Sequence, residues 1–359
     1  MQKIETQIQQ LCSLGLDSRL LMPRLLSLLH GFIPSFANVF FWIDDNGKIS
    51  DIYDENPESY LVLPLFLEHY YNQREREVWC GLEASVKYRQ ALSIEHLWTV
   101  DQKTLMMHGF YNDFLQKCGN HWGLQKPIWV MEKAKGLLLL KRTEKESNFT
   151  QNDVIKLERI SKHIEHALSY QDFETKLIDG KPTEKAVLIV DVNGKIHHYT
   201  NRAERIMMLS QGEDKFRTYR RYSVYHLPAR LMALVQRLRQ VQFGEYTAPA
   251  TEIFSNQWGK FRFSIFPLNA NNQNDAENLY VIQIEHLVPM PIIMMDKIDR
   301  FELTSRQTQI CLNIGLGKTY SDIADSLGIM ESTVISHKKE IFKKIGVATR
   351  HDLSEKILF

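Results

Sequence analysis

The chain has 359 residues, of which 44% are hydrophobic and 24% charged, close to the composition of globular domains. Its 44 Lys and Arg balance 43 Asp and Glu, so the formal net charge is only +1. This composition excludes a disordered or collagen-like chain, and the length favours two or three domains. The apolar run 287–295 is far shorter than the ~20 residues of a membrane span, so we expect no membrane partner.

The N-terminal segment has no apolar core followed by a small-residue cleavage site, so we expect a cytoplasmic protein without a signal peptide. The four cysteines lie far apart and form no C-x-x-C pair. This spacing argues against a zinc site and against a disulfide framework. We therefore expect no metal ligands and four ordinary apolar thiols.

A first domain is predicted over residues 1–150. Its first thirty residues have helical periodicity with a break at Gly15. Residues 36–43 are then rich in strand-forming residues, 44–47 read Asp-Asp-Asn-Gly as a hairpin turn, and 48–53 alternate as a return strand. Closing strands are expected at 126–130 and 136–141.

A helical linker is predicted over residues 151–182. Its apolar residues recur every three or four positions, which indicates one buried stripe. The stripe is either the last layer of the first domain or a parallel dimer seam. The breaker Gly180-Lys-Pro182 ends it.

A second domain is predicted over residues 183–288, and it opens on a strand, an Asp-Val-Asn-Gly turn and a return strand within 186–199. A short helix over 201–209 follows. Alternating strands are expected at 258–266 and 279–286, and a linker at 289–297.

The remaining residues, 298–359, are predicted to form an all-α domain of four short helices. Helices over 320–327 and 331–345 are joined by three residues that include Gly328, which is the pattern of a helix-turn-helix unit. Between Ser332 and Arg350 there are five Lys or Arg and one acid, a local charge of +4. Such a helix suits DNA phosphates, although a solvated helix face has the same pattern.

The same segment resembles the LuxR-type DNA-binding domain without a gap over about fifty residues. The resemblance is carried by Leu303 to Arg306, Ile310, Gly317, Ile323, Ala324, Leu327, Glu331 to Val334, His337, Ile341, Lys344 to Val347 and Arg350. It implies a bacterial transcription regulator that binds a pseudo-palindromic double-stranded operator as a homodimer, with its third helix in the major groove. A contact with RNA polymerase stays open.

By position in the resemblance, Ile335, Ser336 and Lys339 face bases, and Lys343 adds charge to the same helix. The residues expected near phosphates, or bracing the fold, are Ser332, Thr333, His337, Lys338, Lys344, Thr304 and Arg306. The family usually has Glu at Gln307, Ser at Met330 and Lys at Ile335. Because Ile335 suits a thymine methyl better than a guanine, we expect an unusual operator preference.

The two upstream domains resemble sensory modules. The strand–turn–strand at 186–199 followed by Asn201-Arg-Ala-Glu is similar to the opening of a PAS domain. Residues 136–142 followed by Phe149-Thr-Gln-Asn-Asp153 are similar to the close of a GAF domain. Aromatic residues of the first domain are candidates for an apolar ligand pocket, with core packing as the alternative: Trp42, Trp98, Trp122, Trp129, Phe110 and Tyr111.

The sequence thus predicts an α+β multidomain protein with two mixed α/β sensory domains, GAF-like and PAS-like, and a C-terminal four-helix domain. We expect a regulator whose N-terminal domains sense a small molecule or mediate dimerisation. The alternative is a constitutive regulator or scaffold whose upstream domains only dimerise or dock a protein. No catalytic constellation and no cofactor motif is found. The effector, the promoter and the direction of regulation stay open.

Overall fold

The computed structural model describes residues 2–71, 73–169, 181–211, 226–242, 250–268 and 279–358. By contacts between residues, the chain divides into two units. One unit comprises 1–32, 166–181 and 288–359, and the other comprises 33–165 and 182–287. This grouping joins segments that are distant along the chain, whereas the predicted domain boundaries follow the order of the sequence.

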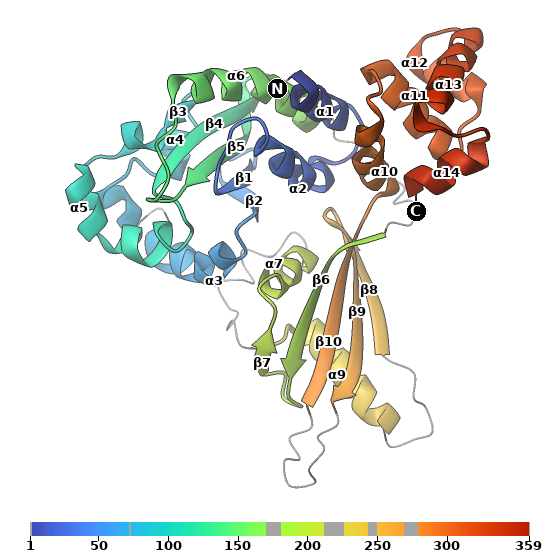
Figure 1. Ribbon diagram of the computed structural model, residues 1–359. Coiled ribbons are helices and arrows are strands. Elements are labelled where there is room, and N and C mark those ends of the chain that lie inside the picture. Colours follow the sequence, from blue (N-terminus) through green and yellow to red (C-terminus); the bar gives the residue numbers. More distant parts are fainter. Residues whose placement is uncertain are drawn as a thin grey trace. The chain divides into compact units, whose positions relative to one another are not determined.

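The larger unit contains two five-stranded sheets whose adjoining strands run antiparallel wherever their register is defined, and these confirm the α+β fold class (Figure 1). The first sheet has the order β2-β1-β5-β4-β3, and the second has the order β7-β6-β10-β9-β8. Numbered from its own first strand, each sheet has the order 2-1-5-4-3. The two regions therefore have the same strand order.

The first sheet is formed by β1 (Ala37–Ile43), β2 (Ile49–Asp54), β3 (Leu92–Ser93), β4 (Trp122–Val130) and β5 (Lys133–Arg142). Its helical segments are α3 (Glu58–Leu65), η1 (Phe66–Tyr70), η2 (Arg74–Glu77), α4 (Leu82–Ser85), η3 (Ile94–Leu97), α5 (Gln102–Met107), η4 (Phe110–Leu115) and α6 (Gln151–Ser169). Both η1 and η4 are π-helical. The predicted hairpin and the two closing strands of this domain are confirmed, with small shifts at their ends.

The second sheet is formed by β6 (Lys181–Val190), β7 (Ile196–Tyr199), β8 (Ala250–Asn256), β9 (Gly259–Leu268) and β10 (Leu279–Val288). Helices α7 (Ala203–Ser210) and α9 (Ala229–Gln242) belong to the same region, and α9 packs on β8 and β9. Phe261, Phe263 and Ile265 alternate along β9 and are fully buried. The sequence alternation that predicted these strands is therefore the alternation of a sheet with one covered face.

The smaller unit contains α1 (Gln2–Cys12), α2 (Ser18–Leu29) and the helices of the C-terminal domain. The latter are α10 (Met290–Ile298), α11 (Ser305–Gly315), α12 (Tyr320–Leu327), α13 (Glu331–Ile345) and α14 (Arg350–Leu358), with the short η6 (Asp299–Phe301) after α10. The break predicted at Gly15 is confirmed, because this residue lies between α1 and α2 with φ of 68°. The four helices predicted from 298 onward are also confirmed.

The segment expected as a linker at 289–297 is almost entirely helical, because α10 covers it. Pro289 precedes the helix and Pro291 lies in its first turn, where the missing N–H is not needed. Met290, Ile292, Met294 and Met295 are buried, so the helix forms part of a core. The Pro-x-Pro run therefore starts a helix and does not form an extended linker.

Within the described residues, no group of three or more His, Cys, Asp or Glu side chains is arranged to hold a metal ion. Among the same residues, no helix is both long and apolar enough to cross a bilayer. All four cysteines are free, and burial raises the pKa of Cys12, Cys118 and Cys311 to about 12.

Candidate nucleic-acid interface and internal cavity

Helix α12 begins at a capping box and ends at a glycine, at the positions that the turn requires. Thr319 and Asp322 form a capping box at the start of α12, and these hydrogen bonds hold the pKa of Asp322 below its usual value. Gly328 ends α12 with φ of 62°, a left-handed conformation that favours glycine. Three residues later α13 begins. The pair is thus a helix-turn-helix unit.

The buried side of α13 is apolar and its other side is polar and basic. Val334, Ile341 and Ile345 are at most 2% exposed and pack in the core. On the other side Ser332, Ile335, Ser336, Lys339 and Lys343 are exposed, while Thr333, His337 and Lys338 are half-buried. This separation follows directly from the helical period, and it leaves a row of side chains free to approach a groove.

Some of the predicted contact residues are tied to the domain itself. The Lys344 ammonium donates to the Gln307 side chain (2.9 Å) and to the Glu302 carbonyl (3.1 Å). The Arg306 guanidinium donates to the Leu327 carbonyl at 3.0 Å. Lys338 lies over the rings of Tyr320 and Phe342, with its ammonium 5.8 and 4.8 Å from their centroids. These groups brace the helices, as does Thr304, whose side chain caps α11.

The structure explains the unusual Gln307. Its amide nitrogen donates to the Glu340 carboxylate (2.7 Å), while its amide oxygen accepts from Lys344. Glutamate at this position would place a second carboxylate beside Glu340, and two like charges in contact are unfavourable. Met330, by contrast, precedes α13 without any side-chain hydrogen bond and is 73% exposed.

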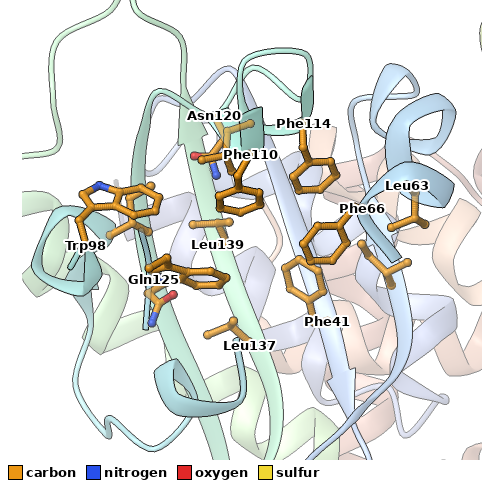
Figure 2. A pocket seen from close by; sticks show the side chains of 14 residues that line it. Phe41, Leu63, Phe66, Trp98, Phe110, Phe114, Asn120, Gln125, Leu137 and Leu139 are labelled. Carbon is orange, nitrogen blue, oxygen red and sulfur yellow. The ribbon is translucent and has the colours of Figure 1, made fainter. Parts of the chain in front are cut away.

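A cavity of about 70 Å³ lies against the first sheet (Figure 2). Leu137 and Leu139 of β5, Gln125 of β4, Phe41 of β1 and Ile52 of β2 form its floor. Its other lining residues come from the segments between β2 and β4: Leu63, Phe66, Trp79, Ile94, Trp98, Phe110, Phe114, Leu115 and Asn120. None of the fourteen carries a charge.

The six aromatic candidates do not gather at one place. Trp98 and Phe110 line the cavity. Trp42 packs edge-on against Phe40 and Trp258, and the Tyr111 hydroxyl bonds His121 at 2.6 Å. The Trp122 indole donates to the Glu146 carbonyl and Trp129 stacks under Arg89. The cavity lies in the aromatic-rich first domain, and its two lining amides, Asn120 and Gln125, carry no distinguishing pattern in the sequence.

The helix-turn-helix geometry and the basic polar face of α13 are the features expected of a DNA-binding domain. Residues 302–356 match the family described as "Bacterial regulatory proteins, luxR family", and this segment is a luxR-family domain. A comparison with curated proteins finds no match.

Several solved structures are similar to the chain at low identity. A phage VqmA–DPO complex is 17% identical, over 48% of this chain and 81% of that one, with a TM-score of 0.19. A Vibrio cholerae VqmA–ligand–DNA complex is 15% identical over 49% and 82%, with a TM-score of 0.25. The Escherichia coli DhaR(N)–DhaL complex is 13% identical over 79% and 89%, with a TM-score of 0.24. At these values the likenesses carry no functional conclusion.

Proposed function

We propose that this protein regulates transcription by binding a pseudo-palindromic operator as a homodimer, with α13 in the major groove. The observation that carries this proposal is the exposed polar and basic face of α13 within a luxR-family domain. Ile335, Ser336 and Lys339 read base edges, while Ser332 and Lys343 lie toward phosphates. Thr304, Arg306, Lys338 and Lys344 hold the helices in place.

To test this directly, operators are selected from random DNA with the full chain. The affinity of α13 variants for the selected operator is then measured. We expect Lys339→Ala to weaken operator binding by about 1–3 kcal/mol and to relax one base position, with a smaller loss for Ser336→Ala. Lys133→Ala removes the same charge from the first sheet, where Lys133 is largely exposed, and is the matched control. Equal effects of the α13 variants and the control would show that α13 does not read the operator.

The exposed apolar side chain of Ile335 sets which base is preferred at one operator position, and a substitution at 335 should change that base. Ile335 is 38% exposed and suits the methyl group of thymine. We expect Ile335→Lys to shift the selected base at that position toward guanine, since a lysine donates to guanine O6 and N7. Sequencing the selected pool checks this, and an unchanged consensus would remove Ile335 from the base-reading set.

The salt dependence separates phosphate contacts from base contacts. Each lysine on a phosphate contributes about one unit to the slope of log K against log salt. We expect Lys343→Ala to reduce that slope by about 1 while leaving the selected sequence unchanged. A slope that stays the same would place Lys343 away from the phosphate backbone.

We further propose that the first-sheet domain binds a small molecule in its internal cavity and that binding changes operator affinity. The enclosed apolar lining of the cavity supports a ligand site. The alternative, in which the upstream domains only dimerise or dock a protein, predicts operator affinity that no small molecule alters. Native mass spectrometry of protein from its own host, followed by operator titration with and without the bound molecule, decides between them.

A further inference from the structure

Helix α13 begins differently from the three other helices of the luxR-family segment. Helices α11, α12 and α14 each follow a threonine whose hydroxyl accepts from the backbone N–H three residues later, and these are Thr304, Thr319 and Thr349. At the same position α13 has Met330, which makes no side-chain hydrogen bond to the helix. Because a methionine cannot replace the hydroxyl acceptor, α13 lacks the stabilisation that the other three helices gain from their caps.

The Met330 side chain does not contribute to packing either. It is 73% exposed, whereas Ile329 before it is half-buried and supplies the packed apolar side chain of the turn. The Met330 carbonyl accepts from the N–H groups of Thr333 and Val334 at 3.0 and 3.2 Å, so its backbone starts the helix while its side chain stays in solvent. A single exposed apolar side chain is ordinary on a protein surface, so its position in the domain decides what it can do.

Met330 lies at the end of α13 that approaches the bases in helix-turn-helix proteins, where the first residues of the recognition helix contact base edges. Ile335, which lies five residues further on, is 38% exposed. Within residues 302–356, all of which the structure describes, these two are the only large apolar side chains that are exposed. The exposed apolar surface of the luxR-family segment is therefore concentrated at the start of its recognition helix.

The charges along α13 indicate which part of DNA this end of the helix meets. The exposed lysines Lys339 and Lys343 lie in the second half of the helix, where they suit phosphates. The first turn carries an exposed acid, Glu331, which already supplies the negative charge that a helix N-terminus attracts. A phosphate is therefore disfavoured at the start of α13, whereas a neutral apolar group is suited to it. The major groove presents one such group, the C5 methyl of thymine.

From these features we infer that Met330 is a specificity-determining residue, whose side chain packs on the methyl group of a thymine in the operator. The inference rests on the proposed function, because it requires α13 to lie in the major groove. Five residues of helix span about 7.5 Å, whereas neighbouring bases of one strand are about 3.4 Å apart, so Met330 and Ile335 contact different thymines. Methionine is suited to this contact, since its unbranched side chain adapts to an irregular surface.

The first test removes the methyl group from the DNA. In the operator selected with the full chain, each thymine position is replaced in turn by deoxyuridine, which lacks only the C5 methyl. We expect two positions of the half-site to weaken binding about fourfold each, the equivalent of one buried methyl group. One of these replacements should have no effect on the affinity of Met330→Ser, and the other none on that of Ile335→Ser. If every replacement affects Met330→Ser as it affects the unmodified protein, the inference is wrong.

The second test compares stability with operator affinity. Met330→Ser introduces a helix cap, so we expect it to raise the melting temperature of the free protein by about 2 °C while it weakens operator binding about tenfold. A residue with a purely structural role would change both quantities in the same direction. Met330→Leu keeps an apolar side chain of similar size and should retain both the affinity and the dependence on the thymine methyl. Unchanged affinity of Met330→Ser would overturn the inference.

Met107→Ser is the matched control. Met107 is 69% exposed at the end of α5 in the first-sheet domain, so its loss should leave operator affinity unchanged. A loss of affinity equal to that of Met330→Ser would contradict a contact between Met330 and the operator.

Lys339→Ala separates this inference from the proposed function. If Lys339→Ala weakens operator binding but Met330→Ser does not, the role of Met330 alone fails. If neither variant weakens binding, α13 does not read the operator, and the proposed function fails together with the inference.

Discussion

The two sheets of the larger unit are built on the same plan, and they differ in how they treat buried polar groups. Both have the strand order 2-1-5-4-3 and both open on a hairpin whose turn reads Asp-x-Asn-Gly-Lys. In the first turn the Asp44 carboxylate accepts from the backbone N–H groups of residues 46 and 48, each at 2.9 Å. In the second, Asp191 accepts from those of residues 193 and 195 at 2.8 and 3.1 Å. The same local chemistry therefore starts both sheets.

The interiors of the two sheets differ in the polar groups that they bury. The first sheet leaves neutral amides unpaired around a cavity and keeps its buried charges paired, with Lys141 2.7 Å from Asp54. The second sheet buries ionisable groups on α7 and β10: burial raises the pKa of Glu204 to about 7 and lowers that of His286, whose ring stacks on Phe261. The two sheets thus share a strand order, but the first encloses a cavity without charged residues and the second buries an acidic and a basic side chain.

The largest expected effect tests the buried pair of the first sheet. Lys141 and Asp54 are 2% and 4% exposed, so Lys141→Met leaves a carboxylate buried without its partner. We expect the free energy of unfolding to fall by about 3–5 kcal/mol, and the second change Asp54→Asn to restore part of it. Arg262→Met in the second sheet breaks a pair with Glu285 that is partly exposed and should cost about 1 kcal/mol or less. Urea unfolding measures both, and similar losses would contradict the contrast.

The next effect concerns the pH dependence of the second sheet. Because burial raises the pKa of Glu204 to about 7, the folded state binds a proton that the unfolded state releases above about pH 4.5. Stability therefore decreases as pH rises from about 4.5 to about 7, by up to about 3 kcal/mol, and then levels off. Glu204→Gln should remove this decrease.

Glu285 serves as the control, because its pKa is shifted in the opposite direction to that of Glu204. Hydrogen bonds from Lys185, followed by those from Arg262, lower its pKa, so its contribution is lost only as pH falls into the acid range. Glu285→Gln should change the acid limb of the stability curve and leave the decrease between pH 4.5 and 7 in place. If the stability of the Glu204→Gln variant depends on pH in the same way as that of the unmodified protein, the Glu204 carboxyl is ionised in the folded state.

The smallest expected effect compares the two turns. Gly47 and Gly194 both have φ of 78°, so alanine at either position costs about 1–2 kcal/mol. A Cβ at Gly47 meets nothing within 4 Å, whereas one at Gly194 would lie 2.0 Å from the Met232 sulfur. We expect Gly194→Ala to lower the free energy of unfolding more than Gly47→Ala does. This difference should disappear when each of the two variants also carries Met232→Ala. Equal costs without the second change would show that Met232 moves aside freely.

Much of the secondary structure of this protein can be predicted from local patterns in its sequence. The strand-forming residues of 36–43 and the alternation of 258–266 predicted strands, the Asn-Gly turns predicted hairpins, and the period of 320–345 predicted a helix-turn-helix with its polar face outward. These features depend on interactions between residues that are close in sequence, so a single chain suffices to predict them. The resemblance of residues 303–350 to the LuxR-type domain depends on equally local patterns, and the family match over residues 302–356 confirms it.

The tertiary structure decided what residues far apart in sequence do together. It turned the expected linker at 289–297 into a buried helix, tied Lys344 and Glu340 to Gln307, and brought Trp79, Asn120 and Gln125 around one cavity. Each outcome depends on which segments pack against one another, since an amide in a strand has the same sequence signature whether its partner is water, protein or a ligand. The sequence determined that this chain carries a helix-turn-helix of the luxR family, and only the packing of the first sheet formed a cavity between segments that are far apart in the sequence.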